Sequence, residues 1–266
     1  MDLNLFKHDN SFLLNKELRK KGNNFIVLNN PFHLAIEWKA INCLNLLLSN
    51  YSNYINYPDI QGRTPLLYAI QKEFMEGIRS ILIHPLVDVS KTDNELNNLY
   101  HYIVHNLNYK DFLEIEFLLT KKIDFIYKSN IYLKQPVFSA IKNNNEYYFN
   151  YTYNKYLLDG YDFKNMYEDI AQYCNNKIII KNFIITNRNN ILKEFNNNNK
   201  LFDISYHYKN ILLCKYLIIM GVNINSVYKT YTNKHVFEFY YKFNKRTINN
   251  KLVNNNNDEK KGKKRL

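Results

Sequence analysis

The feature that most constrains the fold of this 266-residue chain is an internal repeat. The segments NPFHLAI, starting at Asn30, and TPLLYAI, starting at Thr64, have their prolines 34 residues apart, and an alanine follows each proline at the same distance. A fixed period of this length is typical of chains that stack one supersecondary unit many times. Related segments begin near Asn97, Gln135, Met166 and Lys200.

Each copy also carries a second apolar stretch at a fixed distance from its small residue. In four copies, the residues 9, 12 and 13 positions after that small residue are all apolar. These spacings mark the inward face of an α-helix, so each copy predicts a pair of helices. The twelve positions are Leu44, Leu47, Leu48, Ile78, Ile81, Leu82, Ile180, Phe183, Ile184, Cys214, Leu217 and Ile218.

The third and fourth copies depart from this pattern. Tyr102 stands in the small-residue position of the third copy, where the others have Ala or Ser, so we expect that repeat to be wider. Both copies keep the apolar stripe only with an insertion of four residues, which we expect to lengthen a helix or the turn between helices; in the fourth copy it would begin at 143–145. The stripe then falls on Ile115, Leu118, Leu119, Tyr153, Tyr156 and Leu157.

Turn chemistry separates the copies. The polar segment 59–63 precedes Thr64, which can cap a helix, and Pro65, which suits the first helical position. Gly221 can end a helix in the left-handed conformation. With a period near 33 and the segments TPLLYAI and LIIMGVNIN, the chain resembles the ankyrin repeat. The resemblance implies an all-α solenoid of helix-turn-helix hairpins joined by short β-turn connections.

The repeat and its flanking composition predict four regions. Residues 1–24 form an N-terminal helical cap, and residues 227–250 form a C-terminal capping helix or a partial repeat. Residues 251–266 form a disordered basic tail, because they are polar and rich in charge. Between the caps, residues 25–226 hold about six repeats, at about 25–58, 59–91, 92–128, 129–164, 165–198 and 199–226.

Composition excludes several other classes of protein. Six Gly and five Pro are too few for the many turns of a β-sandwich. The formal net charge of +12 is spread along the chain, which predicts a mildly basic surface rather than a nucleic-acid stripe. Three separated cysteines, no secretory signal and no transmembrane stretch predict a cytoplasmic protein with reduced thiols. Abundant Asn, Lys, Tyr, Ile and Phe, encoded by A/T-rich codons, point to a viral, protist or intracellular bacterial genome.

No residue pattern predicts catalysis, a cofactor or a metal site. His101 and His105 lie four residues apart on an expected helix, a spacing that can share a metal, but the sequence places no third ligand. We therefore expect structural or surface histidines. Glu114 and Glu116 fit a solvated helix face, and no nucleophile or phosphate-loop motif occurs.

The resemblance implies a non-catalytic scaffold that binds a protein partner on the concave face of its first helices and turns. We expect a monomer that contacts neither a membrane nor nucleic acid. Two alternatives stay open: a substrate adaptor of a ubiquitin ligase, as in viral ankyrin proteins, and a nuclear or nucleic-acid-associated factor that acts through the basic cluster 260–265. The first candidate contacts are Asp59, Gln61 and Arg63, whose polar groups we expect to project into water, and Asp93 and Asn94 rank below them.

Overall fold

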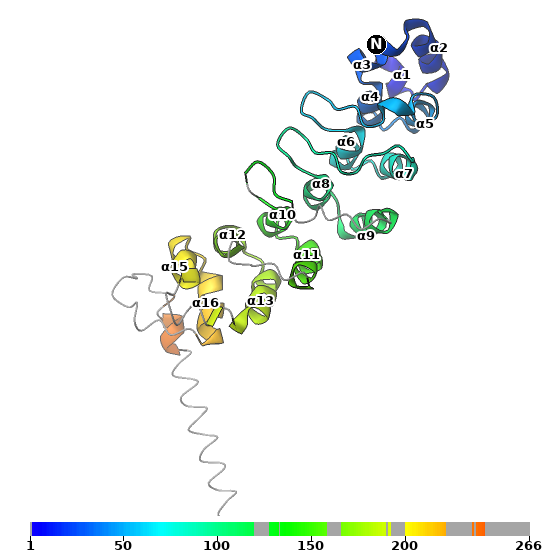
Figure 1. The fold of residues 1–266 in the computed structure, drawn as a ribbon. Helices are drawn as coiled ribbons and strands as arrows, with labels where there is room; N and C mark the ends of the chain where they lie inside the picture. The colour runs from blue at the N-terminus through cyan, green and yellow to red at the C-terminus, as the bar shows by residue number, and fades with distance from the viewer. Residues whose placement is uncertain are drawn as a thin grey trace, which may run out of the picture. The chain divides into compact units, whose positions relative to one another are not determined.

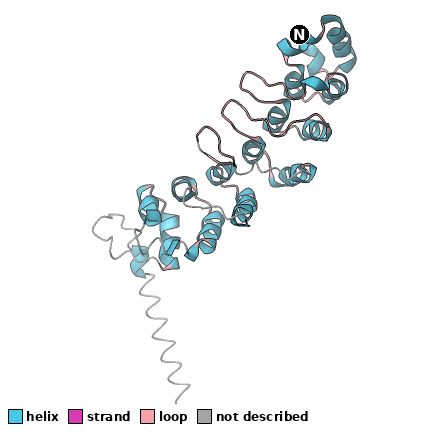
Figure 2. Cartoon of the chain, viewed as in Figure 1, coloured by secondary structure: helices cyan, strands magenta, loops and turns pink. Residues whose placement is uncertain are grey.

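The computed structural model describes residues 2–119, 128–132, 134–158, 166–189, 191–192, 200–221, 236 and 238–242. These residues form helices and turns, and no strand occurs among them (Figure 2). The chain divides into two units, residues 1–160 and 161–266. In each unit, pairs of helices pack on the next pair, which confirms the predicted all-α, ankyrin-type solenoid class.

Unit 1 begins with three short helices, followed by four helix pairs. In Figure 1 the first helices of the pairs lie in one row and the second helices in another, and the loops before α6, α8 and α10 project on the side of the first row. The helices are α1 (Asn4–Lys7), α2 (Ser11–Lys21), α3 (Asn23–Asn29), α4 (Pro31–Glu37), α5 (Ile41–Asn50), the 3-10 helix η1 (Ser52–Tyr54), α6 (Pro65–Gln71), α7 (Met75–Ile83), α8 (Leu99–Asn106), α9 (Tyr109–Leu118), α10 (Pro136–Lys142) and α11 (Glu146–Leu158).

The described part of unit 2 contains two helix pairs, α12 (Met166–Tyr173) with α13 (Lys177–Thr186) and α15 (Lys200–His207) with α16 (Ile211–Met220). The first helices pack on each other, as do the second helices. Asn210, buried before α16, ties the pairs together. Its side chain accepts from the Leu213 amide and donates to the carbonyls of Ile170, Ala171 and Cys174. The expected tail at 251–266 lies outside the described residues.

The apolar stripe predicted for the second helices forms the core. Eleven of its twelve positions are buried, and only Leu82 is partly exposed. The small residues of the first helices are buried as well, which allows close approach of neighbouring pairs: Ala35, Ala69, Ala140, Ala171 and Ser205. Burial of this kind in successive repeats is what holds such a stack together, since no single pair can hide its apolar face.

The third repeat has a different register from the one predicted. Asn98, not Asn97, caps α8. Its side chain accepts hydrogen bonds from the backbone amides of Tyr100 and His101, and its own backbone amide donates to Nδ1 of the His101 ring. The small-residue position is therefore filled by Ile103, which is fully buried. The prediction that Tyr102 fills it was wrong, because the cap shifts the helix by one residue.

This register also removes the predicted insertion within the helix pairs. Phe112 and Ile115, at offsets 9 and 12 from Ile103, are buried, whereas Leu118 and Leu119 are partly exposed. In the fourth repeat Phe149, Thr152 and Tyr153 are buried at the normal offsets, while the side chains of 156 and 157 lie outside the described residues.

The turn at 143–145 is an ordinary one. Asn144 has φ 53°, as Glu73 has φ 51° at the equivalent place in the second repeat. The extra residues of the third repeat lie instead between Ile115 and Asn130. This span is three residues longer than the corresponding span of the second repeat, from Ile81 to Asp93.

Candidate functional site

Three consecutive turns, 59–63, 93–97 and 130–134, share one design. In each turn, the side chain of the first residue accepts hydrogen bonds from the backbone N–H groups two and four residues later. The backbone N–H of the same residue donates to the carbonyl four residues later. The N···O distances are 2.9 and 2.9 Å for Asp59, 2.9 and 2.8 Å for Asp93, and 3.0 and 3.1 Å for Asn130. An Asx side chain thus closes each turn from within.

Neighbouring turns also bond to each other. The Asn94 amide donates to the Gln61 carbonyl at 3.0 Å, and the Ile131 amide donates to the Glu95 carbonyl at 2.9 Å. Gly62 sits at this contact with φ 80°, where a Cβ would lie 2.3 Å from Asn94 Oδ1. Only glycine satisfies both the left-handed backbone and the close approach. The turns therefore form one continuous hydrogen-bonded wall.

The five predicted contact residues lie in this wall, and four of them have side chains that hold it. Arg63 is bonded to the Asp59 carboxylate through Nε at 2.7 Å and Nη2 at 2.5 Å. Asp93 is buried and accepts from Asn97 Nδ2 and the Tyr102 hydroxyl, while Asn94 Nδ2 donates to the Ile60 carbonyl. The expectation that polar groups of the first turn project into water was wrong for Asp59 and Arg63, whose side chains are 12% and 14% exposed. Gln61 and Asn94 are exposed, but only Gln61 has a side chain that makes no hydrogen bond among the described residues.

The contact with Arg63 stabilises the charged form of Asp59. Burial would raise the pKa of Asp59, but the hydrogen bonds and charge of Arg63 together outweigh it and lower that pKa. Arg63 also bonds to Gln71 and lies over the Tyr68 ring, 4.5 Å from its centroid. The guanidinium thereby joins the turn to helix α6, so its main role is structural.

Two histidines connect one repeat to the next. His33 Nε2 lies 2.8 Å from the Arg63 carbonyl, and His101 Nε2 lies 3.0 Å from the Lys134 carbonyl. Burial lowers the pKa of both rings below the usual histidine value, although each also bonds a backbone carbonyl. Because both nitrogens of His101 are used, it does not share a metal with His105 here. Among the described residues, no group of three or more His, Cys, Asp or Glu side chains has an arrangement suited to a metal ion.

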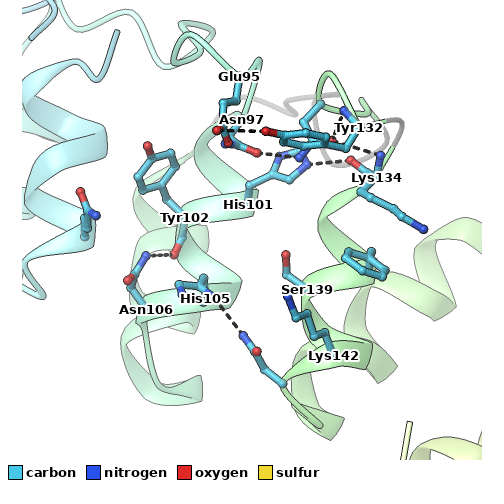
Figure 3. Close-up of a pocket in the computed structure, with 14 residues that line it drawn as sticks. Glu95, Asn97, His101, Tyr102, His105, Asn106, Tyr132, Lys134, Ser139 and Lys142 are labelled. Atoms are coloured by element: carbon cyan, nitrogen blue, oxygen red, sulfur yellow. Dashed lines mark hydrogen bonds between the residues drawn. The ribbon is translucent and has the colours of Figure 1, made fainter. Parts of the chain in front are cut away.

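A groove of about 540 Å³ lies between the turns and the first helices, and we call it the turn-side groove. Figure 3 shows that α8 and α10 form its two long sides and that the turns close one end. Its volume is within the range of ligand pockets in proteins. It is lined by Gln71, Glu95, Asn97, His101, Tyr102, His105, Asn106, Asn130, Tyr132, Lys134, Phe138, Ser139, Lys142 and Asn143.

The turn end of the groove is aromatic and charge-balanced. Tyr132 is 60% exposed, and its hydroxyl lies 3.3 Å from Glu95 Oε1. Lys134 Nζ lies 4.4 Å from the centroid of the Phe138 ring. Exposed tyrosine beside a cation–π pair is the kind of surface that buries area on binding with little loss of side-chain freedom.

The helix end of the groove has a different character. His105 and Asn143 face each other across it, with Nδ1 and Nδ2 3.1 Å apart. Ser139 and Lys142 stand beside them on α10 (Figure 3). Within the described part of the chain, neither the Ser139 hydroxyl nor the Lys142 ammonium has a partner.

Sequence reasoning placed the partner on the face of the first helices and turns and singled out His101 and His105, but it did not assemble the groove. Its residues span 71 to 143, and no local motif connects them. One signal of the groove was present in the sequence. Polar residues lie three or four apart on the first helices, at positions outside the buried stripe, and such residues share one helix face.

Comparison with known proteins gives a distant structural similarity. No protein-family model matches the chain, and a search of curated proteins finds no relative. Among solved structures, the chain is similar to the ankyrin repeat domain of Bcl-3, described as a unique member of the IkappaB protein family. The identity is 20%, the TM-score is 0.34, and the match covers 40% of this chain and 44% of that chain. The match thus spans less than half of the Bcl-3 chain.

None of the helices within the described ranges combines the length and the apolar character needed to cross a membrane.

Proposed function

We propose that this chain is a non-catalytic scaffold that binds a protein partner in the turn-side groove. The observation that carries the proposal is the division of polar side chains in unit 1. Most polar side chains of the turns are hydrogen-bonded within the wall, whereas the side chains of groove residues such as Ser139 and Lys142 make no bond that the fold requires. Side chains of the second kind are available to a partner.

The groove has the composition of a protein-binding surface. It combines an exposed tyrosine and the Phe138 ring with amides and a few charges, and aromatic residues set among polar neighbours dominate binding energy at interfaces. In this proposal Asp59, Arg63, Asp93 and Asn94 act by holding the turns, and Gln61 extends the contact surface past the groove. The ligase-adaptor and nuclear alternatives rest on the chain after 226, of which only residues 236 and 238–242 are described.

A steric block tests the proposal. Ser139→Tyr puts a large side chain into the groove without removing a hydrogen bond of the hydroxyl. Ser49→Tyr, on the exposed end of α5, is the control for adding a tyrosine, and it removes only the bond from the exposed Ser49 hydroxyl to the Asn45 carbonyl. Affinity purification from cells, quantified by mass spectrometry, is expected to recover a partner with the wild type and with Ser49→Tyr, and to lose it with Ser139→Tyr. Equal recovery by all three proteins, each with an unchanged helical spectrum, would contradict the proposal.

A further inference from the structure

The helix end of the turn-side groove contains three side chains whose hydrogen-bonding capacity the fold leaves unused. Ser139 has a free hydroxyl and Lys142 a free ammonium among the described residues. His105 uses Nδ1 with Asn143, and its Nε2 has no partner there. Figure 3 shows the three labelled side chains on facing surfaces of α8 and α10. A hydroxyl, an ammonium and an imidazole can all donate to the same oxygen ligand.

The charges around this end favour an anion. Among the described residues, Glu95 is the one carboxylate that lines the groove, and Figure 3 shows it at the opposite, turn end. Its two oxygens lie within hydrogen-bonding distance of Asn97 Nδ2 and the Tyr132 hydroxyl. Five other carboxylates of unit 1 are paired with cations, in the pairs Glu17–Lys21, Glu37–Lys72, Asp59–Arg63, Asp88–Lys91 and Glu114–Arg79. Lys142 has no such partner within the described residues, so its charge is open to a ligand.

The remaining polar residues suit a polypeptide. Amides of Gln71, Asn106 and Asn143 line the groove, and a carboxamide can both donate to and accept from a peptide main chain. The groove holds two lysines, Lys134 and Lys142, of which the first lies over an aromatic ring. A nucleic acid would need a longer row of cations to neutralise its phosphates. These features favour an acidic peptide segment over an oligonucleotide.

We infer that the turn-side groove receives an acidic segment of the partner protein, with an aspartate or glutamate carboxylate bound between Lys142, Ser139 and His105. This inference rests on the proposed function and specifies the chemistry of the partner. The charge-assisted bond to Lys142 supplies most of the preference for an acid, and the hydroxyl and imidazole fix the position of the carboxylate. The segment continues toward Tyr132, where its neighbouring residues pack on the exposed ring.

The test uses the full chain and a peptide array as the probe. The peptides have varied flanking residues and a central pair that is Glu, Asp, phosphoserine, Gln, Lys or Leu. Five proteins are compared on the array: wild type, Ser139→Tyr, Lys142→Gln, Lys142→Glu and Lys20→Glu. Lys20→Glu, an exposed lysine in the last turn of α2, is the matched control for the charge change. A single-stranded oligonucleotide of equal charge is titrated in parallel.

The wild type and Lys20→Glu are expected to select the acidic pairs over the isosteric Gln pair. Lys142→Gln is expected to weaken binding of the acidic peptides by about three- to tenfold, and Lys142→Glu to reverse the preference toward Lys. Stronger binding of phosphoserine than of Glu would identify the anion as a phosphate group.

Two outcomes would overturn the inference. If the selected peptides are not acidic but Ser139→Tyr still abolishes their binding, the groove binds proteins and only the proposed chemistry fails. If the oligonucleotide binds more tightly than any acidic peptide, the ligand is not a polypeptide. In the separate case that no peptide binds and the purified partner ignores Ser139→Tyr, the proposed function fails as well.

Discussion

The turn at 59–63 and the helix end of the turn-side groove carry similar polar side chains and use them in opposite ways. In the turn, the Asp59 carboxylate accepts two backbone amides and the Arg63 guanidinium, so its capacity is filled by the chain itself. In the groove, Ser139 and Lys142 are bonded to nothing among the described residues. Exposure alone therefore does not identify a binding residue; unused bonding capacity is the better guide.

The difference follows from where each residue lies in the repeat. A turn that reverses the chain leaves backbone N–H groups without helical partners, and a buried unpaired amide costs about 1–3 kcal/mol. The Asp or Asn side chains at 59, 93 and 130 accept hydrogen bonds from those amides. The exposed face of a first helix has no such need, because its backbone is already bonded within the helix.

The largest expected effect tests the register on which this comparison depends. Phe112→Ala should destabilise the chain by about 3–5 kcal/mol, because Phe112 is 2% exposed and leaves a cavity. Leu118→Ala should cost about 1 kcal/mol or less, since Leu118 is only partly buried. Both values come from urea unfolding followed by circular dichroism. The reverse order would restore the register in which Leu118 lies in the core.

A smaller effect is expected when a turn loses the carboxylate of its first residue. Asp93→Ala leaves the amides of Glu95 and Asn97 and the Tyr102 hydroxyl without their acceptor, and should cost about 1–3 kcal/mol. Gln61→Ala, in the neighbouring turn, is the control and should stay within about 0.5 kcal/mol. A titration in which both variants unfold with the wild type would show that the turn acids do not hold the wall.

The histidine contacts between repeats make stability depend on pH. Burial lowers the pKa of His33 in the folded state, so the unfolded chain binds a proton more readily. The folded state thus has its full stability above the unfolded pKa, near 6.5, and loses it as pH falls below that value. Wild type should lose about 0.5–1 kcal/mol more than His33→Leu between about pH 7.5 and 5.5.

His33→Leu is a suitable variant because Leu67 occupies the same position in the second repeat and is buried. The nearby charges of Asp59 and Arg63 act on His33 with opposite signs, so neither removes the effect of burial. If the two proteins lost the same stability on acidification, His33 would not be the titrating group.

The smallest effect should come from the groove. Lys142→Gln should change the free energy of unfolding by less than about 0.5 kcal/mol, because the ammonium has no partner among the described residues. Differential scanning calorimetry of the variant and the wild type measures this change in stability. A loss comparable with that of Asp93→Ala would mean that Lys142 is structural, and the contrast between turn and groove would fail.

Most of the fold could be predicted from the sequence, because burial repeats with the period of the chain. Offsets from Ala35 and Ala69 place Leu44, Leu47 and Ile78 in the core without knowledge of any contact. The third repeat was misplaced by one residue because Asn97 and Asn98 can both cap a helix, and Tyr102 and Ile103 are both apolar enough to be buried. The pairing of Asn98 with His101 was the signal that could have decided it.

The site was harder to predict. Asp59 and Arg63 look like exposed polar residues in the sequence, and only the structure shows that each fills the bonding capacity of the other. The groove depends on α8, α10 and two turns lying together, which no local pattern specifies.

Site-specific photocrosslinking tests the central claim most directly, because it reports which face touches the partner and leaves Ser139, Lys142 and His105 unchanged. A photoreactive phenylalanine analogue replaces either Tyr132, 60% exposed at the groove, or Phe117, 81% exposed on α9. Both positions are aromatic and exposed, so the replacements are matched. The account predicts that the partner crosslinks at 132 and not at 117. Crosslinking at 117 alone would place the interface on the second helices and contradict the account.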